Sequence, residues 1–189
     1  MNIILGSGSK SRKRILERAG FDFKIMTADI DEKAIRLEDP RELVLALAKA
    51  KAEALLPRIK EPAILITADQ VVFCNGQIYE KPENEKQARE YLKSYAIHES
   101  EAINGLVIIN TATGRRVELV ESSKIKFKPI PDSVIDKLIE EGNIFSQAGA
   151  YSAEDPLIAP HVEYIDGTLD SIEGLPSHSL SDFFKEISG

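Results

Sequence analysis

The chain opens with Asn2-Ile3-Ile4-Leu5-Gly6-Ser7-Gly8-Ser9-Lys10-Ser11-Arg12, which reads as a short buried strand, a turn and the start of a helix. Ser9 is a suitable N-cap for a helix that runs to about Ala19, and Gly20 is a suitable C-terminal stop. Free N–H groups at such a helix N-terminus favour the binding of phosphate. A tight structural turn without a ligand explains the same residues equally well.

Several side chains of this opening segment could contact a phosphate group. Ser7 and Ser9 offer hydroxyl donors, and Arg12 can donate two parallel hydrogen bonds. Gly6 and Gly8 permit a tight turn and the close approach of a ligand. The segment matches neither the P-loop, which ends in Gly-Lys-Ser/Thr, nor the dinucleotide-binding fingerprint. The motif is therefore weak by itself.

Composition narrows the class of protein. The chain has 189 residues, 43% of them hydrophobic, which fits one globular domain covering residues 1–189. Its net charge of −7 argues against nucleic acid as a partner. Its one cysteine, Cys74, excludes an internal disulfide, and we expect a buried thiol. Because no signal peptide or long apolar run is visible, we expect a cytoplasmic protein without membrane attachment.

The rest of the sequence predicts strand–helix units mixed with hairpins. Expected strands cover residues 23–27, 63–67, 71–74, 77–79, 102–110, 116–127 and 162–165. Expected helices cover residues 40–56, 85–94, 132–141 and 180–187. The first has Asp39 as N-cap and Pro40 as its first residue, and the second has Asn84 as N-cap. This order indicates an α/β or α+β fold with a mixed, twisted sheet and flanking helices.

Four charged residues are candidates for chemistry. Asp69 follows the expected strand 63–67, and a carboxylate at a strand end can hold Mg²⁺ or accept a proton from water. Glu32 can supply a second metal carboxylate, and Lys51 and Lys81 can neutralise charge on a polyphosphate. The alternatives are ordinary: a turn residue for Asp69, a solvated acidic turn for Glu32, and surface positions for both lysines.

Seven motifs in order resemble those of the Maf family of house-cleaning nucleotide pyrophosphatases. The family's Leu-Ala-Ser-x-Ser-Pro-Arg-Arg matches residues 5–12, and its acidic turn matches Asp31-Glu32. The other matches are Leu-Ala-x-x-Lys-Ala at 47–52, Ala-Asp-Thr/Gln-Val-Val at 68–72, Gly-Lys-Pro at 80–82, Ala-Gly-Ala-Tyr at 148–151 and Gly-Leu-Pro at 174–176. The resemblance covers nearly the whole chain.

The resemblance implies a fold and an activity. The fold would be Maf/ITPase-like, with two lobes around a central cleft, and members are often homodimers. The reaction would be metal-dependent hydrolysis of a nucleoside triphosphate at the α-phosphate, which yields a monophosphate and pyrophosphate and removes non-standard nucleotides. The cation would be Mg²⁺, Mn²⁺ or Co²⁺.

The resemblance also implies roles for particular residues. Asp69 would be the general base, and Glu32 and Asp69 would lie at the metal. The triphosphate would be contacted by Ser7, Ser9, Arg12, Lys51 and Lys81.

Three positions that select the base in this family would be Ser11, Gln70 and Glu154. The dTTP/UTP-cleaving branch tends to carry arginine, threonine and glutamine there, and the 7-methyl-GTP-cleaving branch tryptophan, glutamine and glutamate. This chain matches the second branch at two of the three. A carboxylate such as Glu154 can accept from both N1–H and N2–H of guanine, whereas a pyrimidine offers it one N–H between two carbonyl oxygens. We therefore expect a guanine-type base, with dTTP or UTP as the alternative.

Departures from the family pattern leave two further alternatives open. Lys10 and Ser11 replace proline and arginine, and Gln147 stands where lysine is common. A non-catalytic nucleotide-binding regulatory protein is therefore one alternative, and a phosphatase that releases orthophosphate is another.

Overall fold

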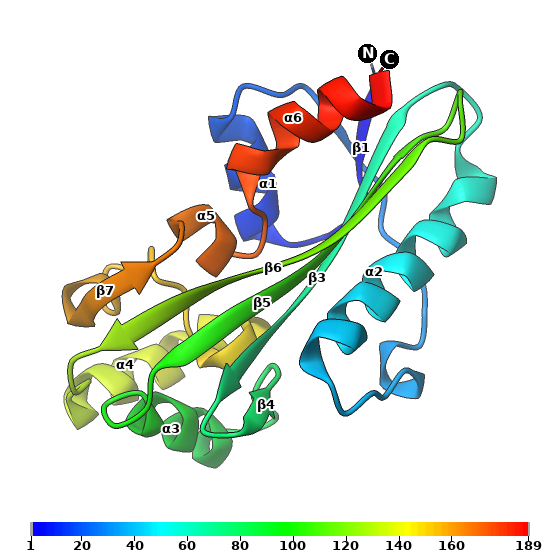
Figure 1. The fold of residues 1–189 in the computed structure, drawn as a ribbon. Helices are drawn as coiled ribbons and strands as arrows, with labels where there is room; N and C mark the ends of the chain where they lie inside the picture. The colour runs from blue at the N-terminus through cyan, green and yellow to red at the C-terminus, as the bar shows by residue number, and fades with distance from the viewer. Residues whose placement is uncertain (1, 189) are drawn as a thin grey trace. The chain divides into compact units, whose positions relative to one another are not determined.

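The computed structural model describes residues 2–188, which form a mixed α/β fold (Figure 1). The sheet has the strand order β2-β1-β3-β5-β6-β7, and β4 pairs with β3. The strands are β1 (Ile3–Leu5), β2 (Lys24–Ile25), β3 (Ile64–Cys74), β4 (Gln77–Tyr79), β5 (Ser100–Asn110), β6 (Arg116–Phe127) and β7 (Val162–Asp166). The α-helices are α1 (Lys10–Arg18), α2 (Pro40–Leu55), α3 (Glu85–Ser94), α4 (Asp132–Glu141), α5 (Leu169–Ile172) and α6 (Ser177–Ser188).

The sheet mixes parallel and antiparallel pairs, as the sequence predicts. Strand β1 runs parallel to both β2 and β3, with Leu5 opposite Ile25 and Ile66. Strand β3 is antiparallel to β4, and β6 is antiparallel to β7. The helix between β1 and β2 and the helix between β2 and β3 are the crossovers that parallel strands require.

The chain divides into two compact units. The first comprises residues 1–69, 104–121 and 174–189, and the second comprises residues 70–103 and 122–173. Strands β3, β5 and β6 each contribute residues to both units. The expectation of a single domain over residues 1–189 stays a prediction.

In the first unit, helices cover both faces of the sheet (Figure 1). Alternate residues of β1 separate the two layers: Ile3 and Leu5 pack with residues of α1 and α6, and Ile4 packs with residues of α2. This alternation is the period-two pattern of a strand, so both faces of β1 are apolar and buried.

The second unit has one large apolar core beneath α3 and α4. Tyr95 and Phe127 are fully buried at its centre, and Tyr151 packs edge-on against both rings. Cys74 belongs to this core and is 1% exposed, which confirms the expected buried thiol. Burial raises the pKa of the Cys74 thiol, so the residue behaves as a small apolar side chain.

Local signals in the sequence predicted the ends of α1, α2, α3 and α4 closely, whereas α6 begins at Ser177, three residues before the predicted start at 180. Ser9, Asp39 and Asn84 each accept a hydrogen bond from a backbone N–H of the helix that follows, as N-caps do. Gly142 ends α4 with a left-handed φ of 74°, a conformation that glycine adopts without steric cost. Helix α5 was not predicted, although Thr168 caps it in the same way.

Two strand predictions need correction. The strand expected over residues 23–27 is confined to Lys24–Ile25, the stretch that pairs with β1. The strands expected over 63–67 and 71–74 are one continuous strand, β3. Its first part pairs with β1, and its last part pairs with β4. Asp69 therefore lies within a strand and not at its end.

Among residues 2–188, no helix is both long enough and apolar enough to cross a lipid bilayer.

Candidate active site

The turn after β1 begins with a glycine that the packing requires. Gly6 continues the ladder by donating from its N–H to the carbonyl of Ile66 at 2.7 Å. A Cβ at Gly6 would lie 2.5 Å from Thr67 Cγ2 and 2.7 Å from Leu55 Cδ1. The close approach that the sequence predicted at Gly6 is made by side chains of β3 and α2 and not by a ligand. Any larger residue at this position would push β1 away from β3 and α2.

Beyond Gly6, two serines shape the N-terminus of α1. The Ser9 N–H donates to Ser7 Oγ at 3.2 Å, and Ser9 Oγ accepts from the Arg12 N–H at 3.4 Å. Gly8, between the serines, is exposed. The loop therefore presents backbone at the positive end of a nine-residue helix, the arrangement that favours phosphate.

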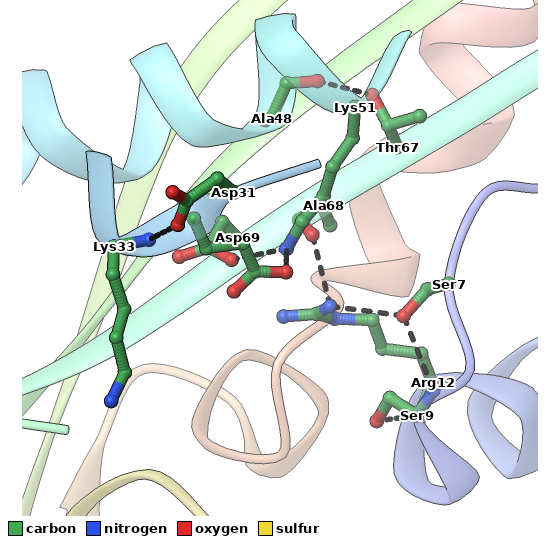
Figure 2. A network of polar contacts seen from close by, with 11 residues as sticks. Ser7, Ser9, Arg12, Asp31, Lys33, Ala48, Lys51, Thr67, Ala68 and Asp69 are labelled. Carbon is green, nitrogen blue, oxygen red and sulfur yellow. Dashed lines mark hydrogen bonds and ion pairs between the residues drawn. The ribbon is translucent and has the colours of Figure 1, made fainter. Parts of the chain in front are cut away.

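Arg12 clamps this loop to its surroundings. Its Nε donates to the Gly174 carbonyl at 2.9 Å. Its Nη1 donates to Ser7 Oγ at 3.1 Å and to the Ala68 carbonyl at 2.9 Å (Figure 2). The side chain is buried, which lowers the pKa of the guanidinium, while Asp69 nearby acts in the opposite direction. Arg12 thus fixes Ser7 relative to β3, and its direct contact with phosphate stays a prediction.

Lys51 joins the two carboxylates predicted at the metal. Its Nζ lies 2.5 Å from Asp69 Oδ1 (Figure 2). The same nitrogen lies 3.1 Å from Glu32 Oε1. The side chains of Lys51 and Asp69 are each 11% exposed, whereas that of Glu32 is 50% exposed. The ordinary interpretation of Lys51 as a surface residue is therefore wrong.

The spacing of residues on β3 and α2 brings Lys51 and Asp69 together. Thr67 and Asp69 are two residues apart on a strand and share a face, and Ala48 and Lys51 are three apart on a helix and share a side. The buried Thr67 hydroxyl donates to the Ala48 carbonyl at 2.8 Å, which fixes α2 against this face of β3. Thr67 was not among the predicted site residues, and its only sequence signal is a hydroxyl within an apolar strand.

Glu32 reaches the site from a short 3₁₀ helix, η1 (Glu32–Ala34). Asp31 caps this helix by accepting from the Lys33 N–H at 3.1 Å, so its carboxylate is used locally. The ammonium group of Lys33 extends away from the pair of Lys51 and Asp69 (Figure 2). Of the acidic turn, Glu32 is thus the residue that contacts Lys51.

The donor set suits a hard divalent cation that also binds substrate. Glu32 and Asp69 both have an oxygen within 3.1 Å of one nitrogen, so a single cation could contact both carboxylates in place of that ammonium group. Within residues 2–188 no group of three or more acidic, histidine or cysteine side chains could hold a metal. Two carboxylates fit Mg²⁺ when phosphate oxygens and water complete its octahedron.

The second unit holds three further predicted residues. Gln70 Nε2 donates to the carbonyls of Ser171 at 3.2 Å and Ile172 at 2.9 Å. Lys81 is exposed after β4, and Glu154 is partly buried in the loop that follows Tyr151. Their contacts with a nucleotide stay predictions.

Ser11, the third predicted base-selecting position, lies in the first turn of α1. Its Oγ accepts from Arg14 Nη2 at 3.3 Å on an exposed face of the helix. The contact leaves the role of Ser11 in base selection a prediction.

Glu173 is a buried carboxylate that sequence reasoning missed. It is 7% exposed and accepts from the Ser152 hydroxyl at 2.9 Å and from the Ala153 N–H at 2.7 Å. Burial raises the pKa of Glu173, and these hydrogen bonds lower it in part. An acidic residue between Ile172 and Gly174-Leu175 was the signal that could have identified it.

Sequence comparison identifies the family of the chain. The sequence model described as Maf-like protein matches residues 2–187, and the chain belongs to the Maf family. A 7-methyl-GTP pyrophosphatase of Dictyostelium discoideum is 42% identical over 98% of this chain and 97% of its own length.

Two further relatives are named for two different substrates. A 7-methyl-GTP pyrophosphatase of Idiomarina loihiensis is 34% identical, over 97% of this chain and 93% of its own length. A dTTP/UTP pyrophosphatase of Clostridioides difficile is 36% identical, over 98% of this chain and 95% of its own length. The relatives therefore agree on the reaction and differ on the base.

Proposed function

We propose that this chain is a metal-dependent nucleoside triphosphate pyrophosphatase. The observation that carries the proposal is the pair of Lys51 and Asp69, 2.5 Å apart in the same compact unit as the phosphate-type loop at Ser7–Arg12. A buried cation beside a carboxylate offers charge neutralisation and a proton acceptor at one place. The names of the Maf relatives support the same reaction.

Each residue has a distinct task in the proposed reaction. Asp69 accepts the proton of the attacking water, while the Lys51 ammonium offsets negative charge that develops on the α-phosphoryl oxygens. Ser7 and Ser9 donate to the phosphates, and Arg12 holds Ser7 in place through a hydrogen bond to Ser7 Oγ. A direct contact of Arg12 with phosphate is part of the proposal as well. Water attacks the α-phosphorus, the α–β bridging P–O bond breaks, and pyrophosphate leaves. Lys81 would contact the same triphosphate.

The proposal includes a divalent cation, Mg²⁺, Mn²⁺ or Co²⁺, held by Glu32 and Asp69 with phosphate oxygens. When bound, it supplies charge neutralisation at the phosphates. With the cation bound, Lys51 would contact the substrate phosphates in place of the two carboxylates. The proposed homodimer follows from the family resemblance alone, and the cytoplasmic location stays a prediction from the sequence.

For the base, we propose a guanine-type nucleotide such as 7-methyl-GTP. Glu154 supplies a carboxylate for adjacent N–H donors, and a relative named for this substrate is 42% identical. A dTTP/UTP pyrophosphatase is the second candidate because relatives that are 36% and 35% identical carry that name.

Hydrolysis in ¹⁸O-labelled water tests the reaction. The protein is incubated with Mg²⁺ or Mn²⁺ and a panel of common and methylated triphosphates, and the products are analysed by mass spectrometry. Attack at the α-phosphorus places the label in the nucleoside monophosphate and leaves pyrophosphate unlabelled. Label in orthophosphate would identify a phosphatase, and absence of turnover across the panel would support a non-catalytic binding protein.

A further inference from the structure

A single short segment of the second unit anchors two of the positions proposed to select the base. The segment is residues 171–173, at the end of α5. Its carbonyl groups at Ser171 and Ile172 accept from the side chain of Gln70. Its carboxylate at Glu173 accepts from the loop that carries Glu154. The two anchors act on different elements, β3 and the loop after Tyr151.

The carboxylate of Glu173 fixes the backbone on the approach to Glu154. Oε1 accepts from the Ala153 N–H at 2.7 Å and from the Glu154 N–H at 3.4 Å. The Ser152 hydroxyl is 2.9 Å from each of the two carboxylate oxygens. These hydrogen bonds hold the peptide groups on both sides of Ala153, and the second of them leads directly into the Cα of Glu154. The backbone on the N-terminal side of Glu154, from which its side chain extends, therefore depends on Glu173.

The anchor of Gln70 also determines which end of its amide is left to a ligand. Ser171 and Ile172 both offer carbonyl oxygens, so the amide must present its NH₂ group to them. Both of these hydrogen bonds are donated by Nε2 of the Gln70 side chain. The carbonyl end of the Gln70 amide is thus an acceptor with a fixed orientation, which suits an N–H group of a base.

We propose that Glu173 is a positioning residue for base selection, which holds the Ser152–Glu154 backbone so that the Glu154 carboxylate meets the N–H edge of a guanine-type base. The inference rests on the proposed function, since it deepens the choice of substrate. A buried carboxylate is a costly way to join two segments, because desolvation opposes its charge, and an apolar side chain would fill the same space. The carboxylate instead supplies two acceptors with fixed direction, which a loop needs when its side chain must be aimed.

The experiment compares binding of two analogues whose α–β bridging oxygen is replaced by CH₂, α,β-methylene-GTP and α,β-methylene-UTP, by calorimetry with Mg²⁺. The variants are Glu173→Ala, which removes both acceptors, and Glu173→Gln, which keeps an oxygen for the Ala153 N–H. Leu138→Ala is the control, because Leu138 is 1% exposed in the core of the same unit and makes no hydrogen bond with the loop. Thermal unfolding confirms that each variant is folded at the temperature used.

The wild type is expected to bind the guanine analogue more tightly than the uracil analogue. Glu173→Ala should weaken guanine binding about tenfold, the effect of misaligning one good hydrogen-bonding group, and uracil binding less than about threefold. Glu173→Gln should restore most of the preference, and Leu138→Ala should leave the ratio of the two dissociation constants unchanged.

Equal weakening of both analogues by Glu173→Ala would overturn the inference, because it would indicate a purely structural role. A wild type without base preference in binding would overturn it as well. Binding without hydrolysis separates the two proposals: a protein that prefers the guanine analogue but cleaves no triphosphate refutes the proposed function, while the ratio of dissociation constants still decides the role of Glu173.

Discussion

Replacement of Asp69 by asparagine should remove catalysis while retaining the fold. The change leaves a carbonyl oxygen in the place of Oδ1, 2.5 Å from Lys51 Nζ, so a hydrogen bond from the lysine persists. It removes the negative charge and with it the group that accepts a proton from water. The side chain is 11% exposed and lies in a continuous strand, so its surroundings have little freedom to rearrange.

The structure allows both consequences of Asp69→Asn to be given a size. Loss of a general base typically costs about 10²–10⁴ in rate, which corresponds to roughly 3–5 kcal/mol in the activation free energy. The hydrogen bond to Lys51 changes from charge-assisted to neutral, which should lower the free energy of unfolding by about 1 kcal/mol. For a chain of this size that loss shifts the melting temperature by about 2–4 °C.

Steady-state release of pyrophosphate and calorimetric unfolding measure the two quantities on the same samples. Glu118→Gln is a matched control, since Glu118 pairs with Lys49 at 2.6 Å and Lys49 also lies on α2. The control exchanges a lysine-paired carboxylate for an amide away from the site, so its kcat should stay within about twofold of wild type because surface changes of this kind are mild. A kcat for Asp69→Asn within threefold of wild type would refute the role of Asp69.

Three further predictions concern other parts of the chain. Arg12→Lys should lower the free energy of unfolding by about 2 kcal/mol in urea titrations, because one ammonium group cannot bond all three acceptors of the guanidinium; an unchanged midpoint would contradict the clamp. Glu154→Gln should reduce kcat/KM for 7-methyl-GTP about tenfold or more relative to UTP, since an amide presents one donor to the donor edge of guanine; an unchanged ranking would reject that reading of the base. Burial raises the pKa of Glu173 in the folded state, so above about pH 4.5 the unfolded chain loses this proton before the folded chain does. The free energy of unfolding of the wild type should therefore fall relative to that of Glu173→Gln as the pH rises, until the raised pKa is passed. Parallel curves of unfolding free energy from pH 4 to 7 would contradict this.

The elements of the fold were largely predictable because their signals are local. An N-cap such as Ser9 or Asp39 acts on N–H groups two or three residues ahead, and Gly142 ends α4 through its own φ angle. The continuity of β3 was not predictable in the same way. Its halves pair with different strands, and the polar residues at its middle resemble a turn when only neighbours in sequence are considered.

The candidate site divides along the same line. The sequence identified Glu32, Lys51 and Asp69 as separate candidates, each with an ordinary alternative. In the structure, one carboxylate oxygen of Glu32 and one of Asp69 lie within 3.1 Å of Lys51 Nζ, so Lys51 is not the surface residue of the ordinary alternative. Contacts between residues 18 or more positions apart depend on which strands pair and which helix covers which face, and no short pattern encodes that choice.

The opening segment illustrates what each level determined. By itself, the sequence determined that residues 2–12 form a strand, a turn and a capped helix, because hydrophobic pattern and capping act over a few residues. Only the tertiary structure decided that Gly6 is required by Thr67 and Leu55, and that Arg12 bonds the carbonyls of Ala68 and Gly174. Those partners are distant in sequence and become neighbours only when β1 pairs with β3 and the chain returns beside α1 at Gly174. These contacts therefore form only in the folded chain, and no local sequence pattern predicts them.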